Sequence, residues 1–137
     1  AANSVEWTGP LFGKNGVKLH ELYRRTRLFA YPSVAERGES FGLAPLEAMA
    51  AGAPAIVSKL DCFKDFIRPG ENGLVFDHRA TNRSDQLAEN LVQLAGDGAL
   101  RARLGAAAWE TAGHFCVEEV ATRYLDDFES VLSRRSP

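Results

Sequence analysis

The chain has 137 residues, of which 45% are hydrophobic and 25% charged, the size and composition of one ordinary globular domain. Sixteen lysines and arginines against eighteen aspartates and glutamates give a net charge of −2, so the chain lacks the excess of positive charge typical of nucleic-acid binding proteins. The sequence contains no apolar run of the roughly eighteen residues that a transmembrane helix needs.

Neither the first residues nor the cysteines indicate secretion. The first residues, AANSVEWTGP, have neither the basic region nor the apolar core of a secretory signal peptide. Cys62 and Cys116 are far apart, which indicates reduced thiols rather than a disulfide framework or a zinc site. We therefore expect a cytoplasmic protein whose full-length form is at most peripheral to the inner face of a membrane.

Strand-like and helix-like segments alternate along the chain. Apolar segments that end at glycine, proline or polar turns predict strands at residues 4–11, 27–33, 53–58 and 72–76. Apolar residues at helical spacing predict helices at 17–26, 45–52, 84–97, 98–115 (one helix or two) and 117–132. Strands that are apolar throughout are typical of a parallel sheet covered on both faces. The sequence thus predicts an α/β fold, a Rossmann-like three-layer parallel sheet, with residues 1–137 forming a single domain or part of one.

The segment ESFGLAPLEAMAAG, residues 39–52, follows the second predicted strand and opens a helix. Ligands of open α/β sheets bind at the carboxyl ends of strands, and a helix N-terminus there offers unpaired N–H groups to a phosphate. Gly42 would let an anion approach the backbone closely. The segment is neither a P-loop nor the dinucleotide-binding fingerprint, because both glycine patterns are absent from it.

Glu39 and Glu47 lie eight positions apart in this segment. We predict Glu39 on the loop and Glu47 in the first helical turn, with Pro45 at the first helical position, so that the two carboxylates bracket the helix N-terminus. Such a pair suits a diphosphate with hydroxyls on both sides, because carboxylates accept hydrogen bonds from hydroxyls. Spacing alone leaves a structural alternative open, in which Glu47 only caps the helix.

The sequence resembles the donor-binding segment of retaining glycosyltransferases of the GT-B fold, in particular the group 1 type (family 4) with its E-x7-E motif. The motif corresponds to Glu39, then SFGLAPL, then Glu47. The similarity continues upstream through VEWTGPL and KLHELYRRTRLFAYPS, and downstream through PGENGLVFD to the closing VEEVATRYLDDFESVL. It therefore covers nearly the whole chain, which would be part of the C-terminal, donor-binding domain.

The resemblance implies a role for each residue of the motif. Glu39 is expected to be the catalytic-site acid that holds hydroxyls of the donor sugar, and Glu47 to hold the ribose hydroxyls. Backbone N–H groups of the stretch between them are expected near the diphosphate or the sugar. The donor-binding residues are Glu39, Ser40, Phe41, Gly42, Leu43 and Glu47. The donor would be a UDP- or GDP-sugar, the anomeric configuration would be retained, and no cofactor or metal is expected.

Three departures from the family pattern bear on activity. The phosphate-binding Arg and Lys of a G-R-x4-K segment and the acceptor-binding N-terminal domain have no counterpart in the 137 residues, and LDCFKDF (60–66) replaces the usual GG-x-x-E, with Asp65 near the place of the acid. We therefore expect the chain alone to be inactive, with the acceptor, a sugar or a lipid, held by an N-terminal domain. Strand 27–32 would lack its usual neighbour and pair internally or with a second copy in a homodimer.

Two further functions remain open from the sequence. The chain could be a non-catalytic nucleotide-sugar-binding module that acts with a partner chain, or a plain α/β structural domain in which Glu47 caps a helix.

Overall fold

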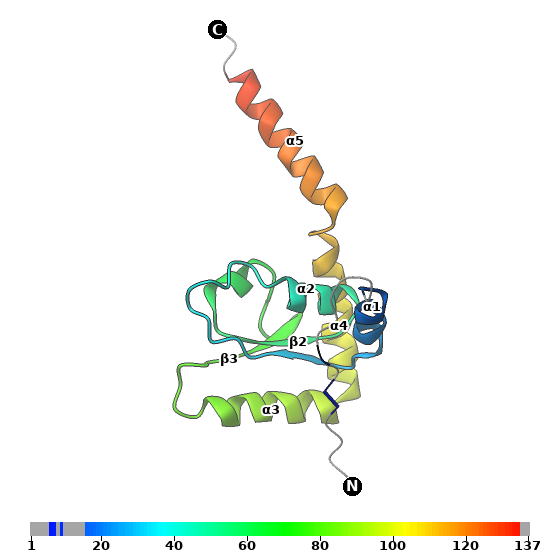
Figure 1. Cartoon of the computed structure of the whole chain (residues 1–137), viewed down its shortest axis with the longest axis vertical. Coiled ribbons are helices and arrows are strands. Elements are labelled where there is room, and N and C mark those ends of the chain that lie inside the picture. The colour runs from blue at the N-terminus through cyan, green and yellow to red at the C-terminus, as the bar shows by residue number, and fades with distance from the viewer. Residues whose placement is uncertain (1–5, 8, 10–15, 135–137) are drawn as a thin grey trace.

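The structure is a computed structural model that describes residues 6, 7, 9 and 16–134 (Figure 1). Its elements in chain order are α1 (Gly16–Arg25), β1 (Phe29–Tyr31), α2 (Leu43–Ala50), β2 (Ala55–Ser58), the 3-10 helix η2 (Asp61–Asp65), β3 (Gly73–Phe76), α3 (Arg83–Gly96), α4 (Gly98–Gly113) and α5 (Val117–Ser133). The alternation of strands and helices that the sequence predicts is confirmed from α1 onward.

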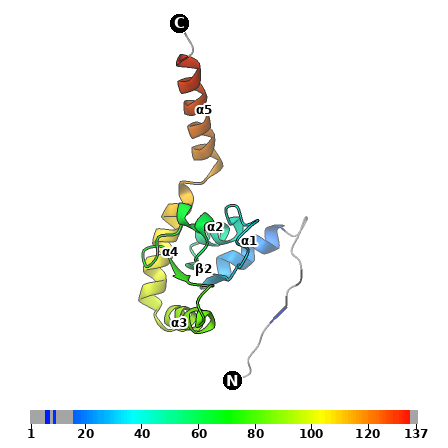
Figure 2. The ribbon, with the colours of Figure 1, turned by 90° about the vertical axis from the view of Figure 1, so that its left-hand side faces the viewer.

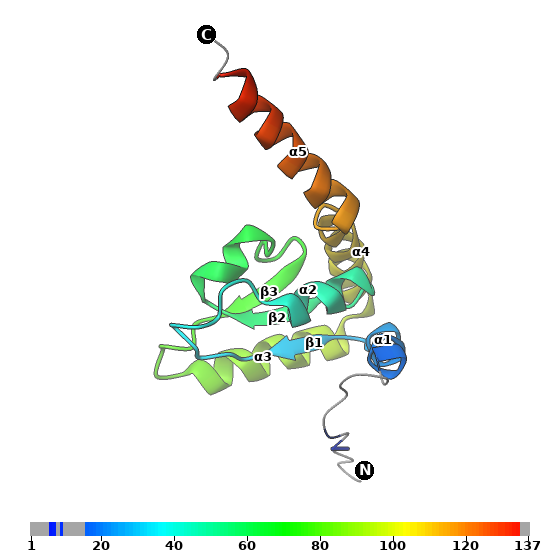
Figure 3. The same ribbon diagram turned by 45° about the horizontal axis from the view of Figure 1, so that its top comes forward.

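The three strands form one parallel sheet in the order β1-β2-β3. Phe29 of β1 is opposite Ala55 of β2, which in turn is opposite Gly73 of β3. Because the strands are parallel, their carboxyl ends lie together at one end of the sheet, as Figure 3 shows. The strand predicted at 4–11 lies largely outside the described residues, and residues 6, 7 and 9, which are described, are not in a strand.

Helices cover both faces of this sheet. All four residues of β2 are buried, and its three apolar residues alternate between two clusters. Ala55 and Val57 pack with Leu46 and Met49 of α2, whereas Ile56 packs on the opposite face. The opposite cluster contains Ile56, Phe76, Leu94 and Leu104. Helix α4 runs from the α3 side of the sheet to the α2 side, contributing Leu104 to one cluster and Ala108 to the other (Figure 1). The predicted three-layer arrangement is confirmed.

Helix α2 begins earlier than predicted. Its first residue is Leu43, so Pro45 is the third helical residue and Glu47 the fifth. The cause is Gly42, whose left-handed backbone (φ +88°, ψ +65°) turns the chain into the helix two residues before the proline. The first turn contains no acidic residue. The predictions that Pro45 opens the helix and that Glu47 lies in the first turn are therefore wrong, and the capping alternative for Glu47 fails with them.

Residues 98–113 form one continuous helix, opened by Asp97, whose carboxylate accepts a hydrogen bond from the Leu100 N–H at 2.9 Å. After α4 the chain bends and α5 projects away from the sheet, as Figures 1 and 2 show from two directions. The predicted apolar face of α5 is present, but no residue of α5 is buried; Tyr124, Leu125 and Phe128 are each at least 61% exposed. No helix in the described part of the chain is both long enough and apolar enough to cross a bilayer.

Candidate functional site

The loop between β1 and α2 carries Glu39 to the carboxyl end of β1. The Tyr31 hydroxyl, on the last residue of β1, donates a hydrogen bond to Glu39 Oε2 at 2.9 Å. This hydrogen bond is the first cause that raises the pKa of Tyr31 above its ordinary value. Glu39 is half-buried and lies outside the helix, as predicted. The strand end thus orients a partly exposed carboxylate.

Gly42 lies at the N-terminus of α2, packed against an aromatic ring. It is buried, and a Cβ atom on it would lie 2.4 Å from Cε1 of Phe63. Phe63 itself is 2% exposed and packs edge-on against Tyr31, with ring centroids 6.0 Å apart. Only glycine combines the positive φ with this close approach. No side chain caps the helix N-terminus, so its first N–H groups are not used by a capping residue.

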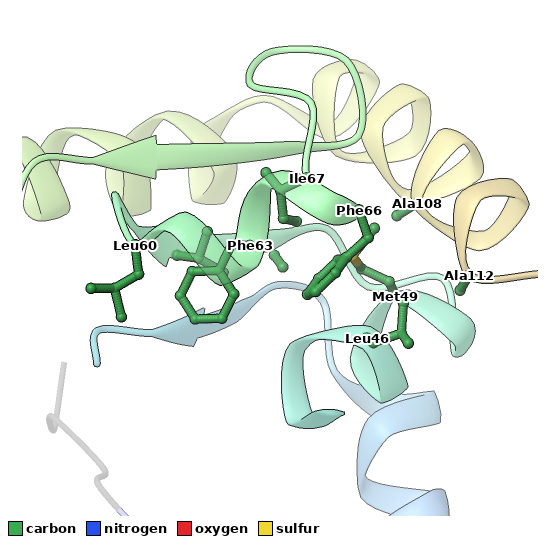
Figure 4. Close-up of a cluster of buried hydrophobic side chains, with 10 residues drawn as sticks. Leu46, Met49, Leu60, Phe63, Phe66, Ile67, Ala108 and Ala112 are labelled. Carbon is green, nitrogen blue, oxygen red and sulfur yellow. The ribbon is translucent and has the colours of Figure 1, made fainter. Parts of the chain in front are cut away.

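The segment 60–66, which departs from the family pattern, packs its phenylalanines against residues of the motif. Figure 4 shows the rings of Phe63 and Phe66 in the cluster that also contains Leu46 and Met49 of α2. Phe41 of the motif is half-buried, with its ring 5.2 Å from the ring of Phe66. Asp65, by contrast, is exposed. The function of this segment in the described structure is therefore packing by its phenylalanines.

Glu47 lies on the solvent side of α2 and is exposed. It lines an open pocket of about 670 Å³ between α2 and the end of α4, together with Leu43, Trp109 and His114. It also lines a pocket of about 360 Å³ between α2 and α1, with Tyr23. The sequence predicts a ligand site at the carboxyl end of β1, but helices and the turn after α4 line both of these pockets, because Glu47 is more than a turn into α2.

Tyr23 of α1 is the buried neighbour of Glu47. Burial, followed by the charge of Glu47, raises the pKa of Tyr23 to about 12. Its ring packs edge-on against Phe29, 5.8 Å away, and Phe29 stacks on Tyr31. Each acid of the motif therefore has a tyrosine beside it, and the ring of Phe29 lies between the rings of these two tyrosines.

The structure thus brings some of the predicted site residues together and separates others. Glu39, Ser40, Phe41, Gly42 and Leu43 are consecutive around the N-terminus of α2, with the Ser40 and Leu43 side chains exposed and that of Phe41 turned into the aromatic cluster. Glu39 does not line either of the two pockets that Glu47 lines. The sequence analysis did not identify Tyr23, Tyr31 or Phe63 as neighbours of the motif. The two aromatic residues of the strand 27–33 were a signal, because Phe29 packs on Tyr23 and Tyr31 packs on Phe63.

The described residues contain no group of three histidine, cysteine, aspartate or glutamate side chains that could hold a metal ion. Cys62 lies near Glu39, and burial, followed by the charge of Glu39, raises the pKa of its thiol. The thiol form is therefore favoured at neutral pH, which gives Cys62 a packing function rather than that of a reactive nucleophile.

Comparison with known families decides what this arrangement belongs to. The model of the family "Glycosyl transferases group 1" matches residues 3–111, which are 109 of the 137 residues. The chain belongs to the glycosyl transferase group 1 family. The matched region ends within α4, so it includes the motif and all three strands but not α5.

Two curated relatives of this group 1 chain are named as glycosyltransferases and are longer than it. It is 34% identical to the phosphatidyl-myo-inositol mannosyltransferase of Mycobacterium leprae (strain TN) over 113 residues, which are 82% of this chain and 29% of the relative. It is 34% identical to the D-inositol 3-phosphate glycosyltransferase of Rhodococcus opacus (strain B4) over 111 residues, 81% of this chain and 24% of that protein. The chain spans less than a third of the length of these relatives.

Solved structures place the group 1 chain among C-terminal domains. It is similar to the C-terminal domain of the group 1 glycosyl transferase LpcC from Francisella tularensis, with a TM-score of 0.61 and 27% identity over 77% of this chain and 50% of that chain. Sucrose-phosphate synthase from Thermosynechococcus elongatus is similar over 69% of this chain and 23% of that chain, with a TM-score of 0.59 and 27% identity. The predicted fold class, part of the C-terminal domain of a GT-B fold, is confirmed.

Proposed function

We propose that this chain is the donor-binding part of a retaining glycosyltransferase, which transfers a sugar from a UDP- or GDP-sugar to an acceptor. One observation carries the proposal. Two carboxylates, Glu39 and Glu47, lie before and after an uncapped helix N-terminus that the left-handed Gly42 opens. A nucleotide sugar has hydroxyls on both sides of a diphosphate, so it matches acceptors on both sides of an N–H-rich helix end.

Glu39 is the group proposed to contact the donor sugar. A carboxylate has about four lone-pair sites, and the Tyr31 hydroxyl occupies one of them on Oε2. The remaining sites are available to sugar hydroxyls, while the tyrosine holds the side chain in place. A pre-oriented acceptor loses little freedom when the sugar binds, which favours positioning of the anomeric carbon.

The helix N-terminus is proposed to bind the diphosphate. The first N–H groups of a helix have no intrahelical acceptor, and no side chain caps those of α2. Ser40, which is exposed, directly precedes Phe41, Gly42 and Leu43 in the chain. Together with the partial positive charge of the helix end, these donors would stabilise the leaving nucleoside diphosphate.

Glu47 is proposed to hold the ribose hydroxyls. It is exposed, lies four residues into α2 from Leu43, and lines the pockets on both sides of the helix. The adjacent Tyr23 supports this role, because a buried neighbour that senses the charge of Glu47 gives the carboxylate a fixed surrounding on the α1 side.

Acceptor binding is proposed to need more protein than this chain. The relatives are three to four times longer than the part that matches, and their names include a phosphatidyl-inositol and an inositol phosphate. We propose that a further N-terminal domain binds a sugar or lipid acceptor. The 137 residues alone would bind a donor weakly without transferring its sugar, because nothing in the described part holds an acceptor beside Glu39.

The proposal is tested by Glu47→Gln in the complete polypeptide that contains this chain. A lost charged hydrogen bond costs about 1.5–3 kcal/mol, so kcat/KM for the donor should fall roughly ten- to a hundredfold while the acceptor KM stays unchanged. A thermal-shift screen with UDP- and GDP-sugars selects the donor beforehand. Glu89→Gln is the matched control, since Glu89 is an exposed glutamate on α3 that lines neither of the two pockets beside Glu47.

Three results would contradict the proposal. Equal effects of Glu47→Gln and Glu89→Gln would remove Glu47 from the donor site. A product with inverted anomeric configuration, read from its NMR coupling constants, would exclude a retaining mechanism. If UDP- or GDP-sugars bind but no transfer occurs in the complete polypeptide, the chain is a binding module instead.

A further inference from the structure

A second carboxylate on the β1–α2 loop, Glu36, is held by two basic side chains that follow β3, the opposite edge strand of the sheet. Glu36 Oε1 is 2.7 Å from Nε2 of His78, and Oε2 accepts a hydrogen bond from Nη2 of Arg79 at 2.5 Å. The two partners follow β3, more than forty residues later in the chain. Figure 3 shows the loops after β1 and β3 meeting at the carboxyl end of the sheet.

His78 makes this contact from a buried position. The side chain of His78 is 4% exposed, and within the described residues its buried Nδ1 has no hydrogen-bond partner. Of the two ring nitrogens of His78, Nε2 therefore has a side-chain partner, Glu36, and Nδ1 has none within the described residues. Because buried polar groups are costly without a partner, removal of the Glu36 carboxylate penalises the ring as well as the loop.

Glu36, His78 and Arg79 together form what we call the clamp, and Arg79 connects the clamp to the end of the middle strand, β2. Its Nη1 donates to the Lys59 carbonyl, directly after β2, at 3.0 Å, and its backbone N–H donates to the Asp77 carboxylate at 3.0 Å. The loop has another tie to the same strand end, where the Ser58 hydroxyl donates to the Ser33 carbonyl at 2.5 Å. The segment that leaves β1 is therefore fastened to the ends of β2 and β3.

This fastening ends three residues before Glu39. Between the clamp at Glu36 and the hydrogen bond of Glu39 to Tyr31 lie only Arg37 and Gly38. Gly38 has a positive φ of +112° and is exposed, so the loop has a flexible residue immediately before Glu39. Without the clamp, the loop would be held near Glu39 by the tyrosine alone.

We propose that Glu36, held by His78 and Arg79, is a positioning residue that fixes the loop carrying Glu39 against the carboxyl ends of the strands, so that Glu39 meets the sugar of the donor. The inference rests on the proposed function of Glu39. It assigns to Glu36 no contact with the ligand. It also identifies the part of the ligand that depends on the clamp, namely the sugar and not the nucleoside diphosphate.

The test compares two ligands with the complete polypeptide that contains this chain. Glu36→Ala should raise the Kd of the better binder of UDP-glucose and GDP-mannose about fivefold, the size of one net hydrogen bond, and leave the Kd of the matching free UDP or GDP within twofold. Glu36→Gln, which keeps an acceptor at the same reach, should recover at least half of the loss. Amide exchange over residues 33–41 should accelerate in Glu36→Ala, with the exchange of β2 unchanged.

The matched control is Glu89→Ala, which removes an exposed carboxylate from α3 and leaves the loop after β1 unchanged. It should change neither Kd nor loop exchange. Equal weakening of nucleotide sugar and free nucleotide by Glu36→Ala, or faster loop exchange with both affinities unchanged, would overturn the positioning role.

A further variant, Glu39→Ala, separates this inference from the proposed function. If Glu39→Ala weakens the nucleotide sugar and Glu36→Ala does not, the inference alone fails. If Glu39→Ala has no effect, or if neither nucleotide sugar binds, the proposed function fails and the inference with it.

Discussion

The close packing of Gly42 on Phe63 predicts a large and specific cost for Gly42→Ala. A Cβ atom at this position would lie 2.4 Å from Phe63 Cε1 and 3.1 Å from Cδ1, distances that no side chain tolerates without movement. The ring cannot move freely, because Phe63 is 2% exposed and packs against both Tyr31 and Phe66. The backbone adds its own cost, since alanine is disfavoured at φ +88°.

The magnitude follows from two terms. A left-handed backbone costs a non-glycine residue about 1–2 kcal/mol, and overpacking a buried position costs about 1–3 kcal/mol. Gly52→Ala is the matched control, because Gly52 follows the same helix with a φ of +81° and a Cβ atom added to it would meet nothing within 4 Å. The two variants share the backbone term and the entropy that alanine removes from the unfolded chain. Their difference therefore isolates packing, and should be about 1–3 kcal/mol.

The assay is urea unfolding of the 137-residue chain and its variants, followed by circular dichroism. The double variant Gly42→Ala/Phe63→Leu should recover part of the loss, since the smaller side chain relieves the contact and the two substitutions are then non-additive. If Gly42→Ala costs no more than Gly52→Ala, or if Phe63→Leu adds its full cost to it, the packing explanation for this glycine is refuted.

Three other outcomes are expected. Tyr31→Phe removes the hydrogen bond to Glu39 and should raise the donor KM about fivefold in the complete polypeptide, with an unchanged acceptor KM; equal changes in both would contradict orientation of Glu39 by the tyrosine. Asn72→Ala should lower the free energy of unfolding by about 3 kcal/mol, because the 2% exposed amide makes three hydrogen bonds of 2.7–2.9 Å; urea unfolding measures this, and a loss below about 1 kcal/mol would contradict it. His78, followed by Arg79, holds the pKa of Glu36 below its ordinary 4.5, so the stability from this carboxylate is present above pH 4.5 and is lost as the pH falls below it. The difference in unfolding free energy between the wild type and Glu36→Gln should therefore shrink from about pH 6 to about pH 3, and a constant difference would argue against the ion pairs.

The local sequence determined the elements and the candidate binding segment. Helical spacing located α1, α3 and α5, and the continuous apolar run at 53–58 indicated a strand buried on both faces, which β2 is. These features depend on neighbouring residues, so periodicity reveals them. The order of acids and glycine in residues 39–47 likewise placed Glu39 on a loop before a helix, because Gly42 interrupts the chain there.

Only the tertiary structure decided how that segment is supported and which way its acids face. The start of α2 at Leu43 moved Glu47 out of the first turn, since the left-handed Gly42 and the ring of Phe63 fix the helix entrance more strongly than Pro45 does. The pairing of Glu36 with His78 joins residues 42 positions apart, at strand ends that only a parallel sheet brings together. Sequence spacing contains no information on such contacts, because they depend on sheet order and packing, which arise from the whole chain.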